Sequence, residues 1–508
     1  MISWTEVKET KEEISHKIHP FFEKYGILST ISYYLGVLLV LLCFLLLIPA
    51  FMAYTIDDNR MLAFCFIVPA VISVVYGLFL MIISEKRELY LGAAISLAAL
   101  AWLVIAIIGG LPFYLARIYI GPEWGLTFVN SVFESMSGFT ATGLNLYGMR
   151  VEGLPSSILF WRSLTQWVGG VGVIVLFLSV LVARTGTIAH KLYLAEGRDH
   201  RLVPSVVNTT RRIWAIYAGY TGLLAIILIG LGMPLFDSVN HSMTTLATGG
   251  FSVQNFSIMN YRLLGYENAF WFEVAIMPFM ILGGISFAMH YQLFLGNVKE
   301  FFDNIEVKAI LIITLISTII LAITLGLTFE SFRYGSFQVI TAITGTGFNT
   351  APVGAWNDFQ KFLLTILMIF GGGYGSTASA IKLLRVVIIF YALIWLIKQY
   401  LLPESAVSRM NIGDKHYSHE AIQNVAVYII LYIILLVSAS MVFMYNGASA
   451  VDSLFEVASA QGNVGLSVGL TGADMPLVEK ITLIIVMWAG RLEIFPVLVF
   501  ITSPFRKH

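Results

Sequence analysis

The chain has 508 residues, of which 58% are hydrophobic and only 12% are charged, whereas a soluble protein carries roughly 25% charged residues. Its formal net charge is zero, which gives no support to nucleic-acid binding by bulk charge. The cysteines, Cys43 and Cys65, lie inside apolar runs. We interpret them as small core residues that say nothing about the redox compartment.

Apolar runs long enough to span a bilayer recur along the whole chain, since a transmembrane helix needs about 20 apolar residues. The polar start, residues 1–26, mixes lysines with acids and precedes a full-length span, so it does not resemble a cleavable signal peptide. The first two runs are YYLGVLLVLLCFLLLIPAFMAY and AFCFIVPAVISVVYGLFLMII. No soluble stretch is long enough to fold alone. We therefore expect an all-α integral membrane protein in a lipid bilayer.

Four polar segments farther along the chain match one another without gaps. They read FESMSGFTATGLN, NHSMTTLATGGFS, FQVITAITGTGFN and FEVASAQGNVGLS, aligned on Gly143, Gly250, Gly347 and Gly465. Six positions before each glycine stands a hydroxyl residue, Ser137, Thr244, Thr341 or Ser459. Nine positions before it stands Glu134, His241, Gln338 or Glu456. This pattern is an internal repeat of about 100 residues.

Each repeat has the same predicted surroundings: a long apolar helix, a short helix of about ten residues, a glycine-containing loop and a second long helix. Four such repeats add eight spans to the two at the start, which gives ten. The predicted divisions are an N-terminal segment with a two-helix hairpin and four repeats, at 1–88, 89–210, 211–306, 307–415 and 416–508. We refer to the four glycine-containing loops as loops one to four.

Irregular backbone at membrane depth is tolerated where protein buries it or where it lines a polar path. Four loops around one axis would point carbonyl oxygens at a central line, and rings of carbonyls can replace the hydration shell of a cation. Packing of small residues between helices is the alternative for a single loop, but four copies in register favour an ion pore. Threonine hydroxyls can support or join the ring. The predicted ion-binding residues are Thr140, Ala141, Thr142, Gly143, Thr248, Gly249, Gly250, Gly345, Thr346, Gly347, Asn463, Val464 and Gly465.

The chain resembles the superfamily of potassium transporters that includes TrkH, KtrB and the plant HKT proteins. The resemblance covers about residues 35–502, and its most specific pieces are FESMSGFTATG, FWRSLTQWVGGVGVIVL, TTLATGGFS, TGTGFNTAP, GGGYGSTASAIKLLR and GRLEIFPVLVF. The two extra N-terminal spans are more similar to TrkH than to KtrB. The resemblance implies four repeats around one pore, a homodimer, and gating by a cytosolic nucleotide-binding ring such as TrkA. Loop four departs from many TrkH proteins, because NVGLS lacks a proline after the glycine.

The distribution of lysine and arginine predicts the orientation, because cytoplasmic loops are enriched in both. The side that holds both termini carries nineteen of these residues and the side of the four loops carries eight. We therefore expect both termini in the cytoplasm and the four loops facing outward, in the cytoplasmic (inner) membrane. The basic loop at about 184–212 is either a docking surface for a regulatory ring or a topology signal only.

The second long helix of repeat three, at about 362–398, would be about 54 Å long if it were continuous, against a hydrocarbon core of about 30 Å. Its middle reads GGGYGSTASA, which is poor helix material. We interpret it as an intramembrane gate loop rather than a packed kink. Arg491 lies deep in another span, where a charge is costly, and we expect it beside this loop rather than at the interface. The predicted gate residues are Gly371, Gly372, Gly373, Gly375, Lys382, Arg385 and Arg491.

Two gate residues leave an alternative open: Lys382 and Arg385, three apart on one helix face, would simply face cytoplasmic water. Glu493, two residues beyond Arg491, is expected to point elsewhere and to be a poor partner for it. Glu134, His241 and Glu456 are interpreted as hydrogen-bonding anchors of the loops.

The sequence thus predicts potassium uptake through a channel-like pore, with potassium as substrate and no cofactor in this chain. The alternatives are a sodium- or proton-coupled potassium symporter, or a sodium-permeable cation transporter of the same fold. An enzyme is not expected, because we find no cluster of His, Cys or acidic residues at catalytic spacing. The chain also has no phosphate-binding loop for ATP hydrolysis.

Overall fold

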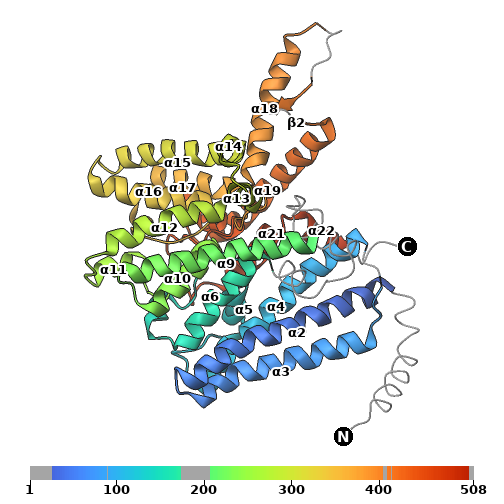
Figure 1. Ribbon diagram of the computed structural model, residues 1–508, viewed down its shortest axis with the longest axis vertical. Coiled ribbons are helices and arrows are strands. Elements are labelled where there is room, and N and C mark those ends of the chain that lie inside the picture. The colour runs from blue at the N-terminus through green and yellow to red at the C-terminus, as the bar shows by residue number, and fades with distance from the viewer. Residues whose placement is uncertain (1–25, 88–89, 173–205, 404–408, 414, 503–508) are drawn as a thin grey trace.

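The computed structural model describes residues 26–87, 90–172, 206–403, 409–413 and 415–502. Within these ranges the secondary structure is helical except for one two-stranded hairpin, in which β1 (Asn411–Ile412) pairs antiparallel with β2 (Lys415–His416) (Figure 1). The polar start of the chain and residues 184–205 of the predicted basic loop lie outside the described residues.

The first two long helices, α2 (Gly26–Thr55) and α3 (Arg60–Ile83), form an antiparallel hairpin. They approach closely because two glycines face each other. A methyl group on Gly36 would lie 2.5 Å from the Gly77 carbonyl oxygen, and one on Gly77 would lie 2.7 Å from the Gly36 carbonyl oxygen. Small residues permit such close packing of membrane helices. The Ser73 hydroxyl ties the pair together by donating to the Leu39 carbonyl at 2.7 Å.

The remaining helices are grouped here by the four predicted repeats. The first repeat has α4 (Leu91–Tyr119), α5 (Phe128–Phe139), η1 (Gly148–Gly153) and α6 (Ser156–Val171). The second has α9 (Val206–Gly230), α10 (Leu235–Leu246), α11 (Met259–Leu263), α12 (Ala269–Gly284), α13 (Phe287–Phe294) and α14 (Val298–Asp303). The third has α15 (Ile305–Thr324), α16 (Phe329–Thr344), η2 (Val353–Ala355), α17 (Asp358–Phe370) and α18 (Leu383–Tyr400). The fourth has α19 (His419–Tyr445), α20 (Ala450–Gln461), α21 (Leu477–Arg491) and α22 (Phe495–Thr502).

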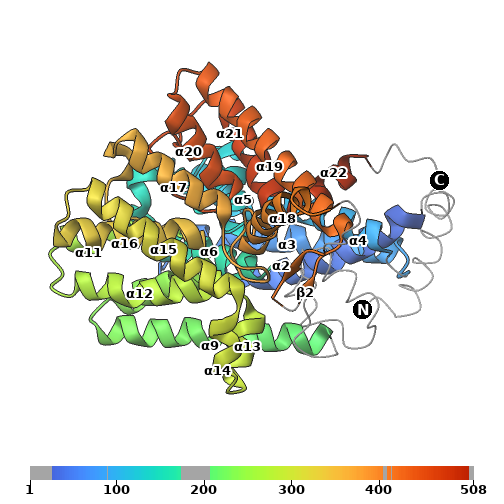
Figure 2. The same ribbon diagram turned by 90° about the horizontal axis from the view of Figure 1, so that it is seen from above.

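The short helices α5, α10, α16 and α20 have 12, 12, 16 and 12 residues, so each is too short to cross a bilayer. Their C-terminal halves are buried inside the protein. The later long helix of each repeat packs against the short helix of the next: α6 contacts α10, α12 contacts α16, α17 contacts α20, and α21 contacts α5. This order closes a ring, and in Figure 2 the third repeat lies between the second and the fourth.

Seven helices of the described residues are long and apolar enough to cross a membrane, or up to nine if each bent helix pair is one span. The bent pairs are α12 with α13, at 106°, and α21 with α22, at 110°. The chain is therefore a multi-pass membrane protein, while the full set of ten spans stays a prediction. The expected break in the second long helix of repeat three is confirmed, because α17 ends at Phe370 and α18 begins at Leu383.

Candidate ion pore and gate

The four loops share one irregular backbone conformation. The residue two positions before each repeat glycine is left-handed, with φ of 54°, 49°, 72° and 52° at Ala141, Thr248, Gly345 and Asn463. The glycines themselves have φ of 94°, 70°, 83° and 96° at Gly143, Gly250, Gly347 and Gly465. Left-handed conformations are costly for residues with a side chain. The loops keep them because each is hydrogen-bonded to the short helix before it. The N–H preceding each glycine donates to a helix carbonyl at 2.8–3.0 Å, in the pairs Thr142–Ser137, Gly249–Thr244, Thr346–Thr341 and Val464–Ser459.

The loops also contact one another in a closed ring. A methyl group on any of the four glycines would collide with a carbonyl oxygen of the next loop. The colliding pairs are Gly143 with Gly249, Gly250 with Thr346, Gly347 with Val464, and Gly465 with Thr142. In every pair the carbonyl belongs to the residue just before the neighbouring loop's own glycine. Glycine is therefore needed at these positions for close approach as well as for its positive φ.

The residues nine positions before the glycines hold the outer ends of the loops, which confirms their interpretation as anchors. Glu134 accepts from the Leu146 N–H at 2.8 Å. Glu456 accepts from the Ser467 hydroxyl at 2.7 Å. The same contact recurs in the other two repeats, where His241 pairs with Ser252 at 3.0 Å and Gln338 donates to Thr350 at 3.4 Å.

The predicted threonine hydroxyls act as supports inside the ring. Thr140 and Thr142 hydrogen-bond to each other at 2.7 Å, and Thr344 and Thr346 do so at 2.8 Å. Loop four instead makes a hydrogen bond between loops, because Asn463 Nδ2 donates to the Thr142 hydroxyl of loop one at 2.8 Å. Loops one and four are therefore joined by a side chain as well as by backbone contact.

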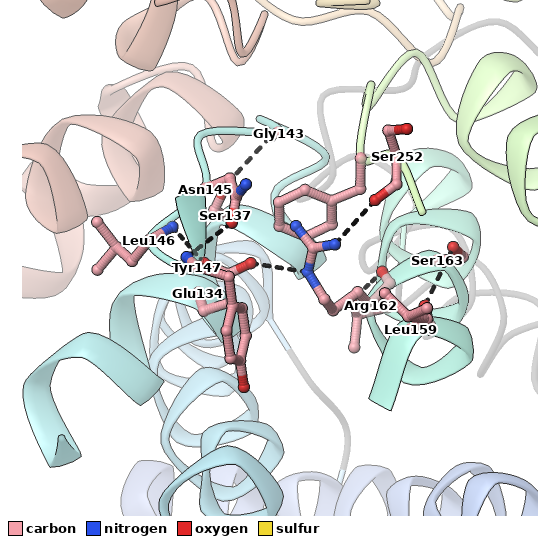
Figure 3. A network of polar contacts seen from close by, with 12 residues as sticks. Glu134, Ser137, Gly143, Asn145, Leu146, Tyr147, Leu159, Arg162, Ser163 and Ser252 are labelled. Carbon is pink, nitrogen blue, oxygen red and sulfur yellow. Dashed lines mark hydrogen bonds and ion pairs between the residues drawn. The ribbon is translucent and has the colours of Figure 1, made fainter. Parts of the chain in front are cut away.

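An arginine that the sequence analysis counted only among the eight basic residues on the side of the four loops lies at the centre of this region. Arg162 of α6 is 1% exposed and donates from Nε to Glu134 at 2.8 Å and from Nη1 to the Ser252 carbonyl at 2.9 Å (Figure 3). Its guanidinium carbon also lies 4.2 Å from the centre of the Phe251 ring. Arg162 thus connects the anchor of loop one with loop two. The sequence feature that could have identified Arg162 is a charged residue inside an apolar helix.

Gln166, one turn farther along α6, is a second residue that the sequence analysis missed. Its Nε2 donates to the Gly249 carbonyl at 2.5 Å, and its Oε1 accepts from the Phe251 N–H at 2.9 Å. The side chain is fully buried. Gln166 and Arg162 are four apart and therefore share a helix face, so the two reach loop two together.

The predicted gate loop, which we define as residues 371–382 between α17 and α18 and call the gate loop, lies directly against loop two. The Thr377 hydroxyl contacts the carbonyls of Leu246 at 3.0 Å and Gly283 at 2.9 Å, and the Thr248 hydroxyl donates to it at 3.1 Å. The opposite side of the gate loop is held by Glu306, which accepts from the Tyr374 N–H at 2.8 Å. Sequence reasoning missed Glu306, which stands near the start of α15 among residues with no motif.

Arg491, the last residue of α21, lies beside the gate loop as expected. It donates to the Thr377 carbonyl at 2.9 Å and to the Ser379 hydroxyl at 3.2 Å. It also donates to the carbonyls of Gly169 at 2.5 Å and Gly170 at 2.7 Å, at the end of α6. The alternative in which this arginine reaches toward the interface is wrong. One guanidinium joins repeats one, three and four.

The alternative in which Lys382 and Arg385 simply face cytoplasmic water does not hold, because protein groups engage both side chains. Lys382 is 7% exposed and donates to the Ala378 carbonyl inside the gate loop. It precedes α18, so it does not share a helix face with Arg385. Arg385 pairs with Glu493 and lies 4.1 Å from the centre of the Tyr428 ring. The expectation that Glu493 points away from Arg491 is consistent with this pairing.

Comparison with known proteins places this architecture in a family. Residues 69–506 match the TrkH cation transport protein family. An uncharacterised cation transporter of Methanocaldococcus jannaschii is 35% identical over 94% of this chain and 96% of its own length. The potassium uptake protein TrkH of Halomonas elongata is 28% identical over 93% of this chain and 98% of its own length.

A solved structure gives the same result. The crystal structure of the potassium transporter TrkH from Vibrio parahaemolyticus superposes with a TM-score of 0.82 at 25% identity, covering 94% of this chain and 100% of that chain. The chain therefore belongs to the TrkH family of cation transport proteins.

Proposed function

We propose that this chain takes up potassium across the cytoplasmic membrane through one channel-like pore surrounded by its four repeats. The observation that carries the proposal is the closed ring in which each loop glycine abuts a carbonyl of the next loop. A ring of backbone oxygens at membrane depth can replace the hydration shell of a cation. The ion-binding residues are those of loops one to four predicted from the sequence, from Thr140 to Gly465. Several relatives are named as potassium uptake proteins, which supports potassium as the substrate.

Coupling to a second ion is the competing mechanism, since proton-coupled carriers use acidic or histidine side chains inside the membrane. The candidates in the short helices are already engaged by the protein. Glu134 is held by Arg162 and the Leu146 N–H, and Glu456 is held by Ser467, Val468 and Thr471. These contacts favour an uncoupled pore. A sodium-permeable pore of the same fold is the remaining alternative, and the measurement below distinguishes it.

The gate in this proposal is the loop at 371–382. Arg491 and Lys382 donate to its backbone carbonyls, and Arg385 lies beside it, 5.8 Å from the centre of the Tyr374 ring. Arg491 donates to the Thr377 carbonyl of the loop, and with the predicted orientation we place its positive charge on the inner side of loop two. A cation that leaves the pore inward would meet both the backbone of the gate loop and this charge. Like charges repel most strongly where water is excluded.

A separate regulatory subunit completes the proposal. The predicted orientation puts both termini and the basic loops in the cytoplasm, where a homodimer would bind a nucleotide-binding ring like TrkA. Copurification from the native source tests this part. Flux that no copurifying protein and no nucleotide changes would contradict it.

The filter assignment is tested by Gly143→Ser in purified protein reconstituted into liposomes. The serine Cβ would collide with the Gly249 carbonyl, so the ring should distort and the potassium-to-sodium permeability ratio should fall. Gly153→Ser is the matched control, because Gly153 is exposed and nothing lies within 4 Å of an added Cβ. Thr142→Val, which removes a buried hydroxyl of loop one with little change in volume, is a second variant. An unchanged ratio in both folded variants would overturn the filter.

A further inference from the structure

The four repeats differ at one buried position beside the loops. Their second long helices align on Gly169, Gly283, Gly371 and Gly490, and the residues three positions earlier are Gln166, Met280, Met368 and Met487. The contacts of three of these glycines support the alignment. An added methyl group would collide with or crowd a carbonyl four residues before the loop glycine, in the pairs Gly169–Phe139, Gly283–Leu246 and Gly490–Gln461. Three repeats thus use methionine where the first uses glutamine.

All four side chains are fully buried. Of the two residue types, only glutamine carries a carboxamide, which can donate through Nε2 and accept through Oε1. Gln166 makes hydrogen bonds to loop two through both Nε2 and Oε1. Its donor reaches the carbonyl just before Gly250 and its acceptor reaches the N–H just after it, so the carboxamide straddles this glycine. A buried amide without partners is costly in lipid, and these two bonds remove that cost.

The Gly249 carbonyl held by Gln166 is also the atom that abuts Gly143 of loop one. We propose that Gln166 is a positioning residue for ion selectivity, which fixes the Gly249 carbonyl and thereby the spacing between loops one and two. This inference rests on the proposed filter. Methionine has no N–H group that could donate to a carbonyl. Met280, Met368 and Met487 therefore cannot supply this constraint in the other repeats, and it distinguishes loop two from the other three loops. Without it, the carbonyl can relax toward a smaller ion, and sodium should be admitted more readily.

The test is Gln166→Met, because methionine is close to glutamine in shape and occupies the aligned position in the other repeats. The potassium-to-sodium permeability ratio in liposomes should fall about fivefold, the effect of about one net hydrogen bond. Met280→Leu is the matched control, since it alters packing at the aligned position of repeat two without removing a hydrogen bond. If Gln166→Met yields no folded protein, Gln166→Leu decides by the same ratio, because it also removes both hydrogen bonds to loop two and adds no charge beside the loops.

The outcomes separate this inference from the filter itself. A lowered ratio in Gln166→Met, or in Gln166→Leu where it decides, with the control unchanged, supports the positioning role. A loss of flux that is equal for both ions, with the ratio unchanged, shows a structural role and overturns the inference. If Gly143→Ser lowers the ratio and the deciding Gln166 variant does not, the filter stands and the inference fails. If neither changes it, both fail.

Discussion

The hydroxyl of Thr248 in loop two donates to the hydroxyl of Thr377 in the gate loop across 3.1 Å. The gate loop therefore touches the candidate filter directly rather than through an intervening helix. Thr377 is 1% exposed and also contacts the carbonyls of Leu246 and Gly283. A gate loop that moves away must break these contacts, so they should contribute to the stability of the closed conformation.

Replacing Thr377 with valine should make the gate easier to open. Valine has nearly the same shape but no hydroxyl, and we take this change as the loss of about one net hydrogen bond, which is worth about 1 kcal/mol. Rubidium uptake into liposomes by the variant alone should therefore rise about fivefold. Thr365→Val is the matched control, because the Thr365 hydroxyl is buried in α17 and, among the residues that the structure describes, hydrogen-bonds only to the Lys361 carbonyl of its own helix. Uptake by Thr377→Val equal to that of the control would contradict the role of this contact.

Removing the charge of Arg491 should have a larger effect on the same measurement. The guanidinium donates to the Thr377 carbonyl and to the carbonyls of Gly169 and Gly170. Arg491→Ala should weaken both the hold on the gate loop and the repulsion of cations, so rubidium uptake without any partner should rise. The permeability ratio should change little, because loops one to four keep their contacts.

Two comparisons make the Arg491 prediction specific. Arg491→Lys keeps the charge but has fewer donors in a different geometry, so its uptake should lie between those of the parent and Arg491→Ala. Arg87→Ala removes an exposed arginine that pairs with Glu85 and should leave uptake unchanged. If Arg491→Ala folds and conducts no more than the parent, the gate lies elsewhere and Arg491 is structural.

The sequence could predict the loops because their information is local and repeated. The spacing of Gly143, Gly250, Gly347 and Gly465 specifies the same turn four times, and the acid or polar residue nine positions earlier lies on the short helix that ends in that turn. The break after Phe370 was also predictable, since the helix is too long for a bilayer and rich in glycine at its centre.

The remaining site residues could not be assigned from the sequence, because their roles depend on which segment lies opposite. Gln166 and Arg162 act on loop two, which is more than eighty residues away in the chain. Glu306 acts on Tyr374 of the gate loop, 68 residues farther along the chain. The placement of Lys382 and Arg385 on one helix face was wrong for a different reason. Helical spacing was applied across a point where the helix had not yet begun.

The ion pair between Glu134 and Arg162 should be essential for folding stability. Both side chains are almost completely buried, and they meet at 2.8 Å. Removing one partner of a buried pair leaves an uncompensated charge and typically costs about 3–5 kcal/mol. Arg162→Met should therefore lower the Tm of the protein in detergent strongly. Glu134→Gln combined with Arg162→Met should recover much of that loss, because no charge is then left buried.

An exposed pair provides the control for this last experiment. Lys308 and Asp303 also meet at 2.9 Å, but their side chains are 53% and 57% exposed, and solvent screens such pairs. Lys308→Met should therefore leave the Tm almost unchanged. Arg162→Met with a Tm equal to that of Lys308→Met would contradict the prediction. If the double variant were no more stable than Arg162→Met, the loss would come from the contacts of Arg162 with Ser252 and Phe251 rather than from the unpaired carboxylate.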